Sequence, residues 1–239
     1  MIYVSTYAGK RHNKSEDAVV VGTKVLRETS AAMPMPQNGF ICVADGVGGN
    51  RGGAQASQFV LTALSNWQET QDKDLRTFLK KVNDRLIAFA AEQGDAPQMA
   101  TTLTGLCLTQ DGYKLVHIGN TRAYIRQGKY LKQITSDHTT YNWLMSSGQT
   151  EAAQSCNRSG ITNCRRNNRR FYPNSISPIV AVFPCAHFRR HSRIFDQDAL
   201  GNHAGEDTYA DKCDAIIQRA REAGSEDDLS VVIVCPLEK

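Results

Sequence analysis

The segment at residues 43–49, with the sequence VADGVGG, places an acid at the end of an apolar run. Residues 40–44 form a short, continuous hydrophobic stretch between Gly39 and Gly46, which predicts a buried strand. A carboxylate at the end of such a strand is held rigidly, and adjacent glycines allow backbone and ligands to approach closely. The sequence therefore predicts that a buried strand holds the Asp45 carboxylate at its end, where it could bind a hard metal ion.

Two other acidic segments also flank apolar strands, near the two ends of the chain. Glu16 and Asp17 precede the apolar residues 18–21, and Asp227 precedes the apolar residues 229–234. Acids from three distant segments, each at a strand end, predict a carboxylate cluster that forms only on folding. Such all-oxygen sites favour Mg²⁺ or Mn²⁺ over zinc. Any one of these acids taken alone fits a solvated turn residue that ends a strand better than a metal ligand.

Length and composition predict one domain over residues 1–239. A chain of 239 residues with 41% hydrophobic content can bury a sizeable core. No apolar run approaches the roughly 18 residues of a membrane span, and the N-terminus has no signal-peptide core, so we expect a cytoplasmic protein. Seven cysteines without regular spacing favour reduced thiols over a disulfide framework.

Hydrophobic periodicity predicts an α+β chain. Strands are expected near residues 2–7, 18–23, 39–45, 101–109, 113–118, 121–127 and 229–235, and helices near 51–67, 73–93 and 207–223. Asp111-Gly112 and Gln127-Gly128 are hairpin signals. The apolar stripes of the three helices are interpreted as core faces.

Six segments, in this order, resemble the metal-dependent protein serine/threonine phosphatases of type 2C (the PPM family). They are SEDA at 15–18, VADGVGG at 43–49, ATTL at 100–103, HIGNTRAY at 117–124, ITSDH at 134–138 and DDLSVV at 227–232. The segments around Asp45 and Arg122 are the most specific of the six. The resemblance covers roughly residues 1–150 and 205–239, and implies a four-layer α/β/β/α sandwich with two central antiparallel sheets flanked by helices.

The resemblance also implies a site with two Mn²⁺ or Mg²⁺ ions. Asp45 would bridge both ions, the carbonyl of Gly46 and Glu16 would act at the second, and Asp227 would bind the first. Asp17 would hold metal-bound water. A hydroxide bridging the ions would attack phosphoserine or phosphothreonine directly. The partner expected is a phosphoprotein, such as the product of a bacterial-type kinase, with no nucleic acid and no membrane, and we expect a monomer.

Two positions depart from the family pattern near the site. The arginine that grips the substrate phosphate in the family is replaced by His12, with Arg11 one residue earlier. Either side chain is a candidate phosphate-binding group, and a solvated basic turn is the alternative. Asn120 stands where the family often has an aspartate that helps to bind a third metal ion.

The largest departure spans about residues 156–204. The family has an apolar strand there that ends in a second Asp-Gly pair, but here residues 179–183 run into Pro184, and no acid occurs between Ala152 and Phe195. Asp196 and Asp198 are the only nearby acids that could replace the missing ligand, and their context gives no strand end. The first metal ion is therefore expected to bind weakly.

This segment holds eight arginines and no lysine between Ala152 and Phe195. The positive net charge of the chain, +4, therefore comes from this segment. Four interpretations are open. A nucleic-acid patch lacks the aromatic residues that stack on bases, and a metal knuckle lacks paired cysteine spacing. A locally frameshifted stretch with reading restored near residue 205, or else a divergent insert, fits the abrupt change better. Inspection of the coding DNA distinguishes these two.

Two functions follow. The chain is an active protein serine/threonine phosphatase, of reduced activity if the first metal site is incomplete. The alternative is a catalytically impaired relative that binds a phosphoprotein as a regulatory module.

Overall fold

The computed structural model describes residues 1–10, 13–47, 52–68, 74–94, 99–127, 130–155, 179–181 and 209–235. Its strands are β1 (Ile2–Tyr7), β2 (Ala18–Val21), β3 (Lys24–Leu26), β4 (Thr29–Met33), β5 (Gly39–Ala44), β6 (Gly46–Val47), β7 (Ala100–Thr101), β8 (Leu103–Thr109), β9 (Gly112–Ile118), β10 (Ala123–Gln127), β11 (Tyr130–Gln133), β12 (Ile179–Ala181) and β13 (Leu229–Val234). Its helices are α1 (Gly52–Ser65), α2 (Leu75–Glu92), α3 (Thr140–Ser146), α4 (Thr150–Ser155) and α5 (Tyr209–Glu222).

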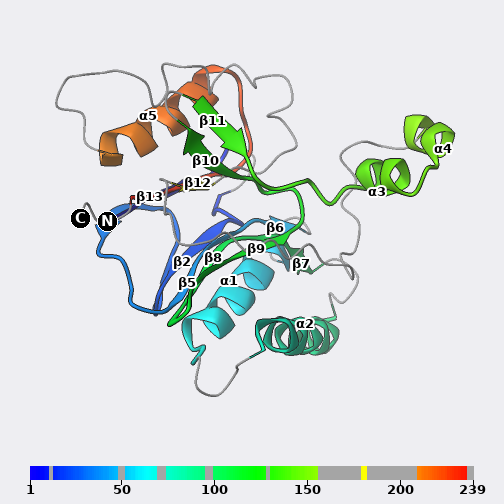
Figure 1. The fold of residues 1–239 in the computed structure, drawn as a ribbon, viewed down its shortest axis with the longest axis horizontal. Coiled ribbons are helices and arrows are strands. Elements are labelled where there is room, and N and C mark those ends of the chain that lie inside the picture. The colour runs from blue at the N-terminus through cyan, green and yellow to red at the C-terminus, as the bar shows by residue number, and fades with distance from the viewer. Residues whose placement is uncertain are drawn as a thin grey trace.

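Two antiparallel sheets lie face to face between two layers of helices (Figure 1). One sheet has the order β11-β10-β12-β13-β1-β4, and the other has the order β3-β2-β5-β8-β9. Helices α1 and α2 cover the five-stranded sheet, and α5 covers the six-stranded sheet. The predicted α/β/β/α sandwich is therefore confirmed.

The alternation of side chains along β5 explains why both of its faces are apolar. Phe40 and Cys42 pack in the core beneath α1 and α2, whereas Ile41 and Val43 pack in the core between the two sheets. Successive side chains of a strand point to opposite faces, so a strand covered on both sides is uniformly hydrophobic. Strand β2 follows the same rule, and it lies beside β5 with Ala18 opposite Ala44.

The chain ends meet in the six-stranded sheet. Strand β13 pairs with β1 from Ile2↔Val234 to Tyr7↔Leu229, and the N-terminal amine of Met1 donates to the carbonyl of Cys235 at 3.1 Å. The buried side chains of α5, Cys213, Ile216, Ile217 and Ala220, pack on this pair of strands. The last strand of the chain is therefore central to the fold.

Most predicted elements are confirmed, with one informative correction. The strand expected at 101–109 is interrupted at Thr102, because its N–H donates to the carbonyl of Asp45 at 2.8 Å instead of joining the sheet ladder. Residues 100–101 pair with Gly46 and Val47 as a separate two-stranded ribbon. The elements that periodicity missed are short or polar: β3, β4, β6, β11, β12, α3 and α4.

The apolar run at 179–183 contributes β12, which pairs with β10 on one side and β13 on the other. Strand β12 pairs antiparallel with β13, from Ile179↔Val234 to Ala181↔Val232. It therefore runs toward the N-terminal end of β13, which begins two residues after Asp227. The other residues of the arginine-rich segment, including Asp196 and Asp198, lie outside the described residues.

Within the described part of the chain, no helix is long and apolar enough to cross a membrane. The four described cysteines, Cys42, Cys107, Cys213 and Cys235, are reduced thiols.

Candidate active site

Hydrogen bonds on both sides of its peptide unit fix Asp45 at the end of β5. Its N–H donates to Thr102 Oγ1 at 3.1 Å, and its carbonyl accepts from the Thr102 N–H at 2.8 Å and from Thr101 Oγ1 at 2.9 Å. The side chain of Asp45 is half-buried. The backbone that carries this carboxylate is therefore rigid, as the sequence predicted.

Asp17 lies at the start of the neighbouring strand and is fully buried. Its Oδ2 accepts a hydrogen bond from the hydroxyl of Ser230 at 2.8 Å. Its Oδ1 is buried, and among the described residues it has no hydrogen-bond partner. Because a buried carboxylate oxygen without a donor is costly, this atom is suited to a cation.

Asp228 joins the N-terminal segment to the C-terminal strand. Its Oδ1 accepts from the N–H of Gly9 at 2.8 Å, and its Oδ2 accepts from the N–H of Glu16 at 2.6 Å. In the sequence, Asp228 is the second acid of the DDLSVV motif, and the motif alone assigns it no role. The acidic pair 227–228 was the available signal, but sequence alone does not say which member is buried.

Three glycines allow the acidic segments to pack closely. A Cβ atom at Gly53 would lie 2.7 Å from the carboxyl group of Glu16, and one at Gly46 would lie 2.2 Å from the carbonyl oxygen of Gly53. A Cβ at Gly9 would lie 2.3 Å from the backbone of Asp227. The N-terminal turn of α1 therefore sits directly against Gly46 and Glu16, and this contact requires glycine.

The electrostatics of the site show that the acids share one region. Burial, followed by the charges of Asp228 and Asp227, raises the pKa of Asp17 to about 8, although the Ser230 hydrogen bond acts in the opposite direction. Burial also raises the pKa of Asp45 well above its usual range, followed by the charges of Asp17, Asp227, Asp228 and Glu16. Folding thus brings together carboxylates from all three predicted segments.

These residues fit a divalent metal ion in their chemistry. The donors are carboxylates and a backbone carbonyl, which are the ligands that Mg²⁺ and Mn²⁺ prefer. A cation would offset the repulsion that raises the pKa of Asp45, and water bound to that cation would supply the donor that Asp17 Oδ1 lacks. Among the described residues, no three His, Cys, Asp or Glu side chains already have their ligand atoms grouped around one point.

Three further residues that the sequence singled out near the site are Arg11, His12 and Asn120. Arg11 and His12 lie outside the described residues, so their role as phosphate-binding groups stays a prediction. Asn120 is buried, and its Oδ1 has no hydrogen-bond partner within the described part of the chain.

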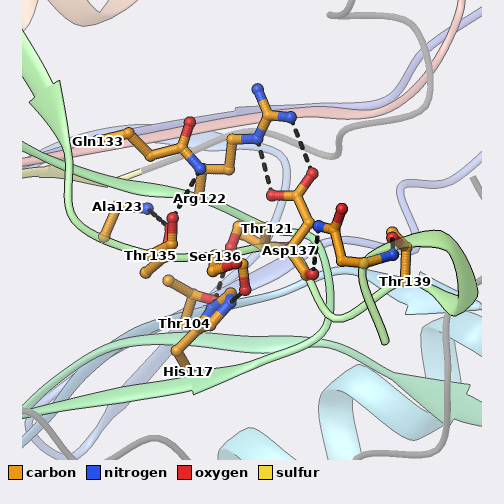
Figure 2. A network of polar contacts seen from close by, with 11 residues as sticks. Thr104, His117, Thr121, Arg122, Ala123, Gln133, Thr135, Ser136, Asp137 and Thr139 are labelled. Carbon is orange, nitrogen blue, oxygen red and sulfur yellow. Dashed lines mark hydrogen bonds and ion pairs between the residues drawn. The ribbon is translucent and has the colours of Figure 1, made fainter. Parts of the chain in front are cut away.

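A second polar network supports the loop that carries Asn120 (Figure 2). Arg122 Nε and Nη2 donate to the two carboxylate oxygens of Asp137 at 2.9 and 2.8 Å. His117 bonds Thr104 Oγ1 through Nδ1 and the carbonyl of Ser136 through Nε2, both at 2.9 Å. These contacts join β8, β9 and the segment 134–138, and they explain why the two family-like motifs at 117–124 and 134–138 occur together.

Comparison with known families identifies the chain. A sequence model described as protein phosphatase 2C matches residues 30–168, and the chain belongs to this family. Among its curated relatives, the serine/threonine phosphatase stp of Listeria monocytogenes is 27% identical over 216 residues, which cover 82% of this chain and 83% of the relative.

Solved structures agree on the fold. The crystal structure of the Mycobacterium tuberculosis serine/threonine phosphatase PstP/Ppp is similar with a TM-score of 0.71 and 23% identity, and the match covers 98% of this chain and 97% of that chain. The catalytic domain of serine threonine protein phosphatase PstP in complex with two manganese ions is similar with a TM-score of 0.63 and 20% identity, and the match covers 98% of each chain.

Proposed function

We propose that this protein hydrolyses phosphoserine and phosphothreonine in proteins by direct transfer of the phosphoryl group to water. The observation that carries the proposal is the convergence of Glu16, Asp17, Asp45 and Asp227, from three distant segments, in one electrostatic region. Family membership and the relatives named as serine/threonine phosphatases support the same reaction.

In this proposal, Asp45 is the central metal ligand, Asp227 serves the first ion, and Glu16 with the carbonyl of Gly46 serves the second. The two ions, Mn²⁺ or Mg²⁺, would acidify a water molecule toward neutral pH and neutralise charge on the phosphoryl oxygens. Asp17 holds and orients that water through the carboxylate oxygen that Ser230 does not occupy.

The bond changes require no covalent enzyme intermediate. The oxygen of water bonds to phosphorus, the bond from phosphorus to the serine or threonine oxygen breaks, and a proton passes to that leaving oxygen. Cys42 and Cys213 are unsuited to an alternative thiolate mechanism, because burial raises the pKa of both thiols, that of Cys213 to about 12. A phosphoprotein made by a bacterial-type serine/threonine kinase is the proposed substrate, and the proposed active form is a monomer.

Replacement of Asp45 tests the proposal. We expect Asp45→Ala to lower kcat/KM for a phosphothreonine peptide in Mn²⁺ by about a thousandfold, because a central ligand of the catalytic ions is lost. The matched control is Asp111→Ala, which removes an exposed acid from the β8–β9 turn and is expected to leave the rate unchanged. Calorimetric titration with Mn²⁺ should show weaker binding only for Asp45→Ala. Equal rates for wild type and Asp45→Ala would exclude the proposed chemistry.

A further inference from the structure

A groove with a volume of about 860 Å³ runs between α1 and α2. The wall formed by α1 and the residue that follows it extends from Ala54 to Asn66, which corresponds to about 18 Å because a helix rises 1.5 Å per residue. At one end lie Lys14 and Ser15, the two residues that precede Glu16. The groove therefore adjoins the candidate active site without being part of it.

The groove is lined by positive charges. Lys14, Arg27 and Arg85 face it, and none of the described residues that line it is acidic. Lys14 and Arg85 are exposed, and the guanidinium of Arg85 lies over the ring of Phe59, 5.8 Å from its centroid. This contact holds the Arg85 charge at the wall of the groove. The electrostatic complement of such a surface is an anionic occupant.

The groove also offers apolar and hydrogen-bonding contacts. The rings of Phe59 and Phe89 stack at 5.0 Å along the wall, where α1 and α2 meet. The buried Oε1 of Gln55, on the same wall, has no hydrogen-bond partner among the described residues. A peptide backbone would supply an N–H donor to this atom, which an anion without hydrogen, such as sulfate, cannot do.

We propose that this groove binds an acidic segment of the phosphoprotein substrate. An extended segment of about five or six residues matches the 18 Å length, because a strand rises about 3.3 Å per residue. Its acidic side chains contact Lys14 and Arg85, and an apolar side chain packs against Phe59 and Phe89, whereas the guanidinium of Arg27 already donates to Ala54 and Ser57. The phosphatase thereby selects phosphorylation sites that lie beside an acidic stretch. This inference rests on the proposed function, but peptide binding can be measured without catalysis.

The first experiment measures binding to the full chain. The probe is a fluorescein-labelled peptide without phosphate, of sequence Glu-Asp-Glu-Leu-Asp-Glu, and the readout is fluorescence polarisation. The test variant is Arg85→Glu, and the matched control is Arg76→Glu, an equally exposed reversal on α2 that does not line the groove. We expect Arg85→Glu to weaken binding about tenfold or more and Arg76→Glu to leave it unchanged, with salt weakening binding to the wild type.

The second experiment measures catalysis. Phosphothreonine peptides carry either this acidic segment or its Gln/Asn counterpart, on the N-terminal or the C-terminal side. We expect the acidic peptide to have the lower KM in one of these orientations, and Arg85→Glu to remove that advantage without changing kcat/KM for p-nitrophenyl phosphate. If the protein hydrolysed none of these phosphoesters, the proposed function would be refuted. The fluorescence polarisation measurement would still show whether the groove binds an acidic peptide.

Three results would overturn the inference. The first is absence of probe binding to the wild type, and the second is equal loss of binding in Arg85→Glu and Arg76→Glu. The third is a wild-type dimer in analytical ultracentrifugation that the Arg85→Glu variant does not form, together with no binding of the probe. That result would assign the groove to a second copy of the chain.

Discussion

Asp17 illustrates how a single residue can link function to stability. It is fully buried beside other acids and retains one carboxylate oxygen without a donor. Burial and the charges of Asp228 and Asp227 raise its pKa to about 8. In the absence of metal, the folded protein therefore binds a proton on Asp17 at a pH where the unfolded chain does not.

This difference predicts the pH dependence of the metal-free protein. Between about pH 4 and pH 8 the folded state holds more protons at Asp17 than the unfolded state, so the free energy of unfolding falls as pH rises through this window. Urea unfolding in EDTA at pH 5 and pH 8 measures the effect. Added Mn²⁺ should restore stability at pH 8, and Asp17→Asn should flatten the metal-free profile. A metal-free protein more stable at pH 8 than at pH 5 would contradict this prediction.

His117 changes the free energy of unfolding with pH in the opposite direction from Asp17. Burial, and then the neighbouring His138, lower the pKa of His117 to about 4, although its bond to the Ser136 carbonyl and the charge of Asp137 act against this. Below pH 6.5 the unfolded state binds the proton more readily, so the stability contribution of His117 is lost as pH falls from about 6.5 to about 4.

The check is an acid titration of stability with Mn²⁺ present. His117→Gln is expected to be less stable at pH 7, because the bonds to Thr104 and Ser136 are disturbed, but to lose less further stability between pH 6.5 and pH 4. An NMR titration of the His117 ring gives its pKa directly. A ring that titrates near 6.5 in the folded protein would remove the argument.

At the scale of elements, the placement of α1 connects the helix layer to the candidate active site. A Cβ at Gly53 would meet the carboxyl group of Glu16, and one at Gly46 would meet the backbone of Gly53. Ser57 of the same helix donates to the carbonyl of Glu16 at 2.6 Å. The first turns of α1 thus set the position of a proposed metal ligand.

Gly53→Ala should therefore affect the site more than the fold. We expect kcat with Mn²⁺ to fall about tenfold or more, since a misplacement of about 1 Å is enough for such losses, while alanine retains good helix propensity. Gly94→Ala is the comparison, because its Cβ would meet nothing within 4 Å but its φ of +77° disfavours alanine. That variant should lose about 1 kcal/mol of stability and keep its activity. Similar losses of activity in both variants would argue against a specific role for Gly53.

At the scale of the whole molecule, the sandwich joins the two ends of the chain. Strand β13 lies between β12 and β1, and Asp228 next to it bonds the backbone of Gly9 and Glu16. The core between the sheets contains apolar residues from β1, β2, β5 and β13. Each sheet therefore needs the other to bury its inner face.

We therefore expect a single cooperative unfolding transition for the full chain, as predicted for one domain. Far-UV circular dichroism and tryptophan fluorescence should give coincident urea curves. Deletion of residues 229–239 should abolish this transition, because a central strand is lost. Two separated transitions in the full chain would contradict the single-domain prediction.

The main helices and strands and the chemistry of the site could be predicted from the sequence. Continuous apolar runs such as residues 40–44 predict buried strands, and three-to-four-residue periodicity predicts α1, α2 and α5, because local burial patterns follow local geometry. Acids at strand ends, together with the family motifs, indicated Asp45, Glu16, Asp17 and Asp227, and the structure brings these together electrostatically.

Features that depend on residues far apart in the chain could be seen only in the folded structure. It inserts the three-residue β12 between β10 and β13, ends the β8 ladder at Thr102, and turns Asp228 inward as the acceptor for Gly9 and Glu16. It also forms the basic groove between α1 and α2 from residues 14–89. Short strands and single buried carboxylates carry little local signal, because their stability comes from hydrogen bonds to residues far away in the chain.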